Sequence, residues 1–97
     1  AVYVLNWRQR LSHACPMSDV VDQALGQVLR KLRTERGWSQ SDLALRVEMD
    51  RNYLSLIELG RSSPSVRMLM RLCTALDVRA ADVLGDLERR VQAQRQF

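Results

Sequence analysis

The residues from 51 to 56 carry side chains that suit contacts with the edges of nucleic-acid bases. Arg51 can donate two parallel hydrogen bonds to guanine, and Asn52 can pair in a similar two-point way with adenine. Ser55 can bond to either base, and Leu56 offers apolar contact to a thymine methyl group. Such chemistry requires an element that presents all four side chains on one side.

A helix over residues 51–59 would meet this requirement. Asp50 precedes it as a capping residue, and Gly60 follows it as a terminator. Leu54 and Ile57 then face inward, so the residues suited to base contacts lie on the outward side.

A second predicted helix, residues 39–47, comes immediately before. Ser39 caps it and Asp42 occupies the third helical position, which is a pattern resembling a capping box. Leu43, Ala44 and Val47 form its buried face. Three residues separate the two helices, which is the layout of a helix-turn-helix, although other helical hairpins share that spacing.

No residues are arranged for catalysis, for metal binding or for a cofactor. The chain has one histidine, His13, and two cysteines, Cys15 and Cys73, which lie far apart and form no C-x-x-C pair. Cys73 falls on an apolar helical stripe and is predicted to be a core residue. A structural zinc site needs four ligands, and no phosphate loop or nucleophile with a neighbouring base is present. We therefore expect no enzyme, no metal, no cofactor and no small-molecule ligand.

The net charge of +4 suggests an anionic partner, but the positions of the charges weaken this suggestion. Residues 17–86 contain ten basic and ten acidic side chains, so this part of the chain is neutral. The excess comes from Arg8 and Arg10 before it and from arginines after residue 88. A case for nucleic-acid binding must therefore rest on individually placed groups.

The length of 97 residues fits one domain, and from Ser18 on its apolar periodicity is helical. We predict an all-α fold of five short helices with no strand. No apolar run is long enough for a membrane span and no signal peptide is evident, so a cytoplasmic location is expected. The expected helices cover residues 19–36, 39–47, 51–59, 66–77, and a last segment that follows a link beginning at Val78 and ends near Gln94.

Several motifs keep the register of one known family. They are Gly37 to Ser39-Gln40, Leu43-Ala44, Leu54-Ser55 to Ile57-Glu58, Gly60, Pro64-Ser65 and Ala75-Leu76. From about Leu25 to Leu84 the chain resembles the Cro/repressor-type, or Xre-like, helix-turn-helix regulators. Within that family, residues 50–55 most resemble the controller proteins of restriction-modification systems. The resemblance implies a compact lambda-repressor-like DNA-binding domain whose second and third helices form the motif.

The resemblance also implies roles for single residues. The third helix would enter the major groove of double-stranded DNA, with base contacts from Arg51, Asn52, Ser55 and Leu56. Phosphate contacts, which set register without selecting sequence, would come from Gln40, Tyr53 and Arg61. Arg33 and Glu58 match a structural ion pair, and Trp38 matches a core position.

Three residues depart from the family pattern. Leu56 stands where relatives often place a polar base contact, and Leu59 stands where they often have a polar phosphate ligand. Glu48 replaces the usual turn glycine and should strain the turn if its backbone is left-handed there.

Recognition by such domains usually uses two copies about 34 Å apart on a palindrome, so we expect a homodimer. The apolar stripe of the last helix is the candidate interface, through Leu84, Leu87 and Val91. An alternative is that Val83 and Leu84 only complete the core.

Two further questions stay open at this stage. Residues 1–16 either precede a natural start at Met17, as added residues or through an upstream start codon, or form a segment whose residues 2–5 dock on the domain or on a partner chain. Residues 17–87 are expected to form the domain, and residues 88–97 a helical extension or tail. The function is either sequence-specific transcription regulation at the nucleoid or, with Leu56 and Leu59 as contacts, protein interaction without DNA binding.

Overall fold

The computed structural model describes the backbone of residues 16–95 and side chains from 20 to 94. Over this range the chain is helical or in turns, with no strand, as predicted. Five helices follow one another: α2 (Pro16–Glu35), α3 (Gln40–Val47), α4 (Arg51–Glu58), α5 (Val66–Ala75) and α6 (Ala80–Arg95). The predicted all-α fold is confirmed.

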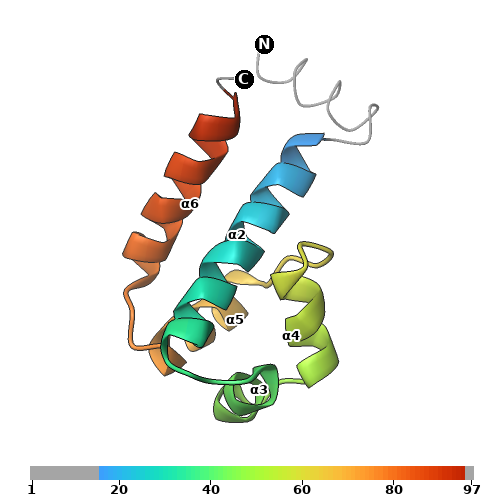
Figure 1. Cartoon of the computed structure of the whole chain (residues 1–97), viewed down its shortest axis with the longest axis vertical. Helices are drawn as coiled ribbons and strands as arrows, with labels where there is room; N and C mark the ends of the chain where they lie inside the picture. Colours follow the sequence, from blue (N-terminus) through green and yellow to red (C-terminus); the bar gives the residue numbers. More distant parts are fainter. Residues whose placement is uncertain (1–15, 96–97) are drawn as a thin grey trace.

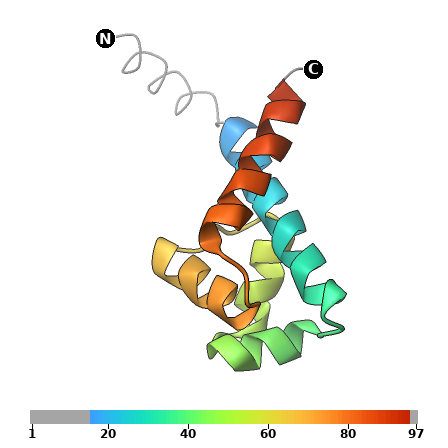
Figure 2. The ribbon, with the colours of Figure 1, turned by 90° about the vertical axis from the view of Figure 1, so that its left-hand side faces the viewer.

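The two long helices, α2 and α6, lie side by side and run in opposite directions (Figure 1). The three short helices gather at the end where α2 finishes and α6 starts, and a turned view places α3 across the bottom of the molecule (Figure 2). α4 packs against both α2 and α3, so its position depends on two neighbours.

One apolar core joins all five helices. Six of its side chains are fully buried, and burial of each such side chain stabilises the fold by about 1.5–3 kcal/mol. These six are Leu29, Leu43, Leu54, Ile57, Leu72 and Leu76. Cys73 is also buried, which confirms its predicted core role, and burial raises the pKa of its thiol.

α3 and α4 start at the predicted caps, and α5 starts at a cap of the same kind. The side chains of Ser39, Asp50 and Ser65 each accept a backbone N–H from the first turn of α3, α4 and α5. At α3 the reciprocal bond is also present, because the Ser39 N–H donates to Asp42 Oδ2 at 2.9 Å. The predicted capping box is confirmed.

Some predicted boundaries are wrong. α2 begins at Pro16, three residues before the predicted start at residue 19. α5 ends at Ala75, two residues before the predicted end at residue 77. α6 continues past Leu87, so residues 88–95 extend the last helix, and the division of the chain into 17–87 and 88–97 stays a prediction.

His13 and Cys15, like the rest of residues 1–15, lie outside the described part of the chain. Within residues 16–95, no group of three or more His, Cys, Asp and Glu residues is placed to hold a metal ion. None of the helices in this range combines the length and the apolar character that a membrane crossing needs.

Candidate nucleic-acid interface

The outward face of α4 carries the residues predicted to contact bases. Arg51 and Asn52 are exposed, Ser55 is half-buried, and Leu56 is 39% exposed. Leu54 and Ile57, on the other side of the same helix, are fully buried. The structure therefore brings all four predicted base-contacting residues onto one accessible helix face, with a buried face behind them.

The turn between α3 and α4 is left-handed at a residue other than glycine. Glu48 has φ 56° and ψ 49°, which is the left-handed conformation. This is the case in which glutamate in place of the usual glycine was predicted to strain the turn. The turn is closed by two bonds, from the Met49 N–H to the Ala44 carbonyl at 2.9 Å and from the Glu48 N–H to the Leu45 carbonyl at 3.3 Å. These are the bonds of a Schellman motif, which glycine usually occupies.

Arg71 of α5 supports this turn, which sequence reasoning missed. Its Nη2 donates to the Val47 carbonyl at 2.8 Å, at the C-terminal end of α3. The same nitrogen lies 3.8 Å from Glu48 Oε2, between two exposed side chains. An arginine in the next helix but one thus satisfies a carbonyl that the end of α3 leaves unpaired.

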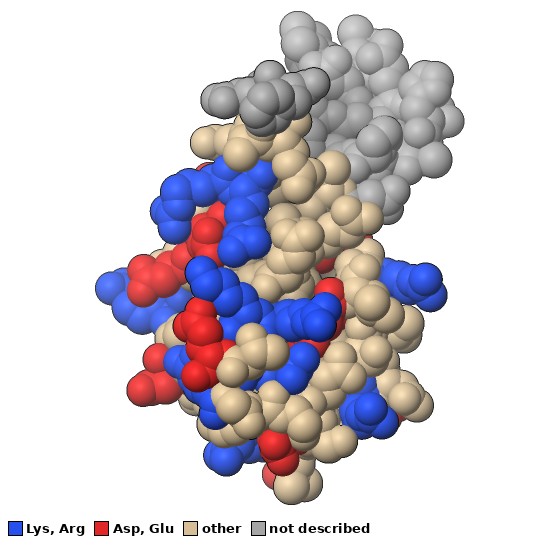
Figure 3. Space-filling model, viewed as in Figure 1, with Lys and Arg blue, Asp and Glu red and all other residues tan. Residues whose placement is uncertain are grey.

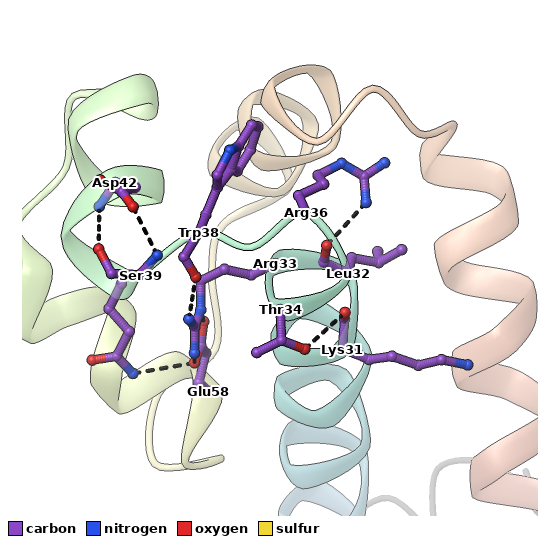
Figure 4. A network of polar contacts seen from close by, with 10 residues as sticks. Lys31, Leu32, Arg33, Thr34, Arg36, Trp38, Ser39, Asp42 and Glu58 are labelled. Carbon is purple, nitrogen blue, oxygen red and sulfur yellow. Dashed lines mark hydrogen bonds and ion pairs between the residues drawn. The ribbon is translucent and has the colours of Figure 1, made fainter.

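A buried ion pair ties α4 to α2, as the resemblance implied. Arg33 Nε donates to Glu58 Oε2 at 2.7 Å, and Arg33 Nη2 donates to Glu58 Oε1 at 2.9 Å. The third arginine nitrogen, Nη1, donates to the Trp38 carbonyl at 2.7 Å, at the approach to α3 (Figure 4). One side chain thus reaches both α4 and the segment that precedes α3.

Gln40, predicted as a phosphate ligand, also belongs to this network. Its Nε2 donates to Glu58 Oε1 at 3.1 Å. Because a primary amide has two N–H donors, this bond accounts for one of them. The contact connects the first residue of α3 with the last turn of α4 and gives Gln40 a structural role that the sequence did not indicate.

Trp38 is half-buried against the core, which agrees with its predicted position. The Arg46 guanidinium lies over its ring, with the carbon Cζ 4.0 Å from the ring centre. This cation–π contact joins the segment before α3 to the last turn of α3 and was not predicted.

The other two predicted phosphate ligands lie near the loop after α4. The Tyr53 hydroxyl donates to the Ser63 carbonyl at 3.5 Å, and its ring packs partly against the core. Arg61 has an exposed side chain, and its backbone N–H bonds to the Leu56 carbonyl at 2.9 Å. Both residues border the loop that follows the exposed face of α4.

The predicted interface on α6 is only partly free. Leu84 is 44% exposed, but Leu87 packs against the domain's own core and Val91 is half-buried. Val83 is buried at 3% exposure, so it completes the core. Arg90 pairs with Asp86 at 3.4 Å and reaches Gln27 Oε1 on α2 at 3.4 Å, which ties α6 to α2.

The surface agrees with the neutral charge count. Over the face that α2 and α6 present, acidic and basic side chains are intermingled (Figure 3). On the side where α4 lies, the visible basic side chains stand apart among uncharged ones. An anionic partner would therefore meet individual positive groups on this side.

Comparison with known proteins decides the family. A helix-turn-helix family model, HTH_3, matches residues 29–83, more than half of the chain. The chain belongs to this helix-turn-helix family. The Cro/repressor-type resemblance is thereby confirmed, and the relatives ClgR and SinR are transcriptional regulators and not enzymes.

Individual members of the helix-turn-helix family are similar over most of their length. The transcriptional regulator ClgR of Mycobacterium tuberculosis is 35% identical over 78 residues, which are 80% of this chain and 70% of ClgR. The crystal structure of ClgR from Corynebacterium glutamicum has a TM-score of 0.73 at 33% identity, covering 78% of this chain and 81% of that one. The controller protein C.Esp1396I, solved as a tetramer with its natural 35 base-pair operator, has a TM-score of 0.66 at 26% identity and covers 74% and 95%.

Proposed function

We propose that the chain is a sequence-specific regulator of transcription that binds double-stranded DNA as a homodimer on a palindromic operator. The observation that carries the proposal is the outward face of α4, where Arg51, Asn52, Ser55 and Leu56 share one accessible side. The buried face of the same helix fixes that side relative to α2 and α3. A helix that carries polar side chains on its outward face suits insertion into a major groove about 12 Å wide.

Each residue on this face would make a different base contact. Arg51 would bond guanine through two nitrogens and Asn52 would bond adenine through its amide, whereas Ser55 would bond either base. Leu56, with 39% of its surface exposed, would lie against a thymine methyl group. The half-site should therefore contain a guanine next to an adenine, with a thymine close by.

Phosphate contacts would come from Gln40, Tyr53 and Arg61, which flank this face. Gln40 is the first residue of α3, where the helix dipole favours an anion, and one of its two amide donors bonds to Glu58. Arg61 has an exposed guanidinium beside the loop after α4. The neutral balance of residues 17–86 means that these contacts, together with the arginines near the ends, would set the salt dependence.

The second copy would pair through α6. Leu84 is its most exposed large apolar side chain, and Val91 lies seven residues further along the helix. Leu87 would contribute only the part of its side chain that stays accessible, since it already packs against the core. C.Esp1396I, which is similar in fold, is a tetramer on its operator, and this supports multiple copies on one duplex here.

The domain so defined would be residues 17–87, with 88–97 as the extension of the pairing helix and 1–16 outside it. A DNA partner implies action at the nucleoid, in the cytoplasm. Protein interaction without DNA binding is the second candidate, because Leu59 is 58% exposed next to Leu56 on the same helix end.

Selection of bound sites from random duplexes at near-physiological salt tests the proposal. We expect a palindromic sequence whose half-sites are about 10–11 base pairs apart. The variant Arg51→Ala with Asn52→Ala serves as control and should enrich no such sequence. Protein interaction is the better account under two conditions: the unaltered protein enriches no sequence, and the double variant still binds the same partner proteins as the unaltered protein.

A further inference from the structure

Gly26, in the middle of α2, lies against the backbone of α4. A methyl group at this position would stand 2.5 Å from the carbonyl oxygens of both Ile57 and Glu58, and 2.8 Å from the Glu58 carbonyl carbon. Gly26 is itself buried. Because these neighbours are backbone atoms and not flexible side-chain ends, no rotamer change could make room.

A second contact of the same kind lies one turn earlier in α2. Gly60, which follows α4 with φ +79°, would bring a methyl group within 2.7 Å of Gln23 Cγ and 2.8 Å of Gln23 Cα. Gln23 and Gly26 are three residues apart and Arg33 is seven further on, so all three share one face of α2. This face holds the end of α4 at successive points.

Glu58 connects these contacts with the buried ion pair. Its backbone carbonyl meets Gly26, whereas its carboxylate accepts bonds from Arg33 and Gln40. A change at Gly26 that moves Glu58 must therefore alter the position of α4 relative to both α2 and the start of α3.

We infer that Gly26 is a positioning residue that sets how far the recognition helix α4 stands out from α2. An ordinary carbon–oxygen contact is about 3.3 Å or more, so alanine would require α4 to move by about 0.8 Å. This displacement is larger than about 0.5 Å, which is how closely the side chains of a binding site must be held to their productive positions. The inference rests on the proposed DNA-binding function, because it assigns Gly26 a share in sequence discrimination.

The matched control is Gly85, in the interior of α6. Its added methyl group would have one neighbour, Arg89 Nη1, at 3.6 Å, which is an ordinary contact. Both Gly26→Ala and Gly85→Ala gain the same intrinsic helix preference. They differ in what the methyl group meets.

Thermal unfolding, NMR amide shifts and DNA affinities are measured for both variants at a temperature where they are folded. We expect Gly85→Ala to raise the Tm and to leave the affinities unchanged. Gly26→Ala should lower the Tm, shift the amide signals of residues 51–60, and weaken binding of the selected duplex by about tenfold, the equivalent of one base contact. Binding of a mixed-sequence duplex should change little.

The inference is overturned if Gly26→Ala behaves as Gly85→Ala, or if it weakens both duplexes in the same proportion. If Gly26→Ala does not fold, the variant Glu58→Gln, which keeps the shape of the side chain, is measured in its place. Glu58→Gln should lower the preference for the selected duplex over the mixed-sequence duplex. An unchanged preference overturns the inference. If the unaltered protein prefers no duplex, the proposed function fails, and the NMR shifts alone then show whether Gly26 positions α4.

Discussion

Arg33 and Glu58, 25 residues apart in the chain, form a two-point ion pair at 2.7 and 2.9 Å. The hydrogen bonds to Glu58 raise the pKa of Arg33, against an opposing effect of burial, so the guanidinium stays charged. With the Trp38 carbonyl and the Gln40 amide added, the pair joins α2, α4 and the start of α3. Such a pair fixes the angle of α4 more than it adds net stability.

Removing one partner of this pair should be costly, because the other charge stays buried. We expect Arg33→Met to lower the free energy of unfolding by about 3–5 kcal/mol, measured by urea titration. The control is Arg90→Met, which breaks a half-exposed pair with Asp86 and should cost less than about 1 kcal/mol. Equal, small losses for the two variants would contradict the account, because they would mean that the Glu58 carboxylate is not left as an unpaired buried charge.

The left-handed turn offers a stabilising substitution. Glu48→Gly should raise the free energy of unfolding by about 1 kcal/mol, because glycine adopts φ 56° without steric cost. Asp77, also at φ 56° after α5, is a matched second site for the same substitution. If Glu48→Gly is destabilising while Asp77→Gly is not, the contact of Glu48 with Arg71 outweighs the strain.

The capping box of α3 should make part of the stability pH-dependent. The Ser39 N–H, together with the Ser39 hydroxyl, lowers the pKa of Asp42. A lowered pKa favours the folded state above the unfolded pKa of about 4, and this contribution is lost as the pH falls through the folded value. Urea titrations should therefore show Asp42→Asn less stable than the unaltered protein at pH 7, with the difference shrinking towards pH 3.

Ser39→Ala is the control for this pH effect. The Asp42 N–H donates to Ser39 Oγ at 3.0 Å whatever the charge of the carboxylate. Its loss should therefore weaken the fold at both pH values. A difference for Asp42→Asn that is the same at pH 7 and pH 3 would contradict the account.

What could be predicted from the sequence was local. The caps at Ser39 and Asp50 and the strain at Glu48 depend on residues at most three positions apart, and the structure confirms them. The bond from Gln40 to Glu58 and the support of Val47 by Arg71 span 18 and 24 residues. These contacts require the tertiary arrangement, and no periodicity in the sequence specifies them.

Apolar patterning was similarly informative for the core and less so for the surface. The stripe on the last helix predicted one interface, yet the packing of α6 on α2 divides it, with Leu87 towards the core and Leu84 towards solvent. Gly26 gave no signal, because a glycine in a helix is noticed only when the helix packed against it is known.

The pairing of two copies should depend on Leu84. Leu84→Asp places a charge on the exposed side of α6 and should shift the sedimentation of the protein from dimer to monomer at micromolar concentration. Leu45→Asp, on α3, is the control, because Leu45 is 80% exposed and lies on another helix. Dissociation by both substitutions, or by neither, would argue against pairing through α6.

The central claim is that the face of α4 selects the base sequence, and the ratio of affinities for a selected and a mixed-sequence duplex tests it most directly. At physiological salt we predict a ratio of about 10³ or more for the unaltered protein, falling at least tenfold in Arg51→Ala. Arg61→Ala should weaken both duplexes together and leave the ratio intact. A ratio near one for the unaltered protein, or a ratio that Arg51→Ala leaves unchanged, would contradict the account.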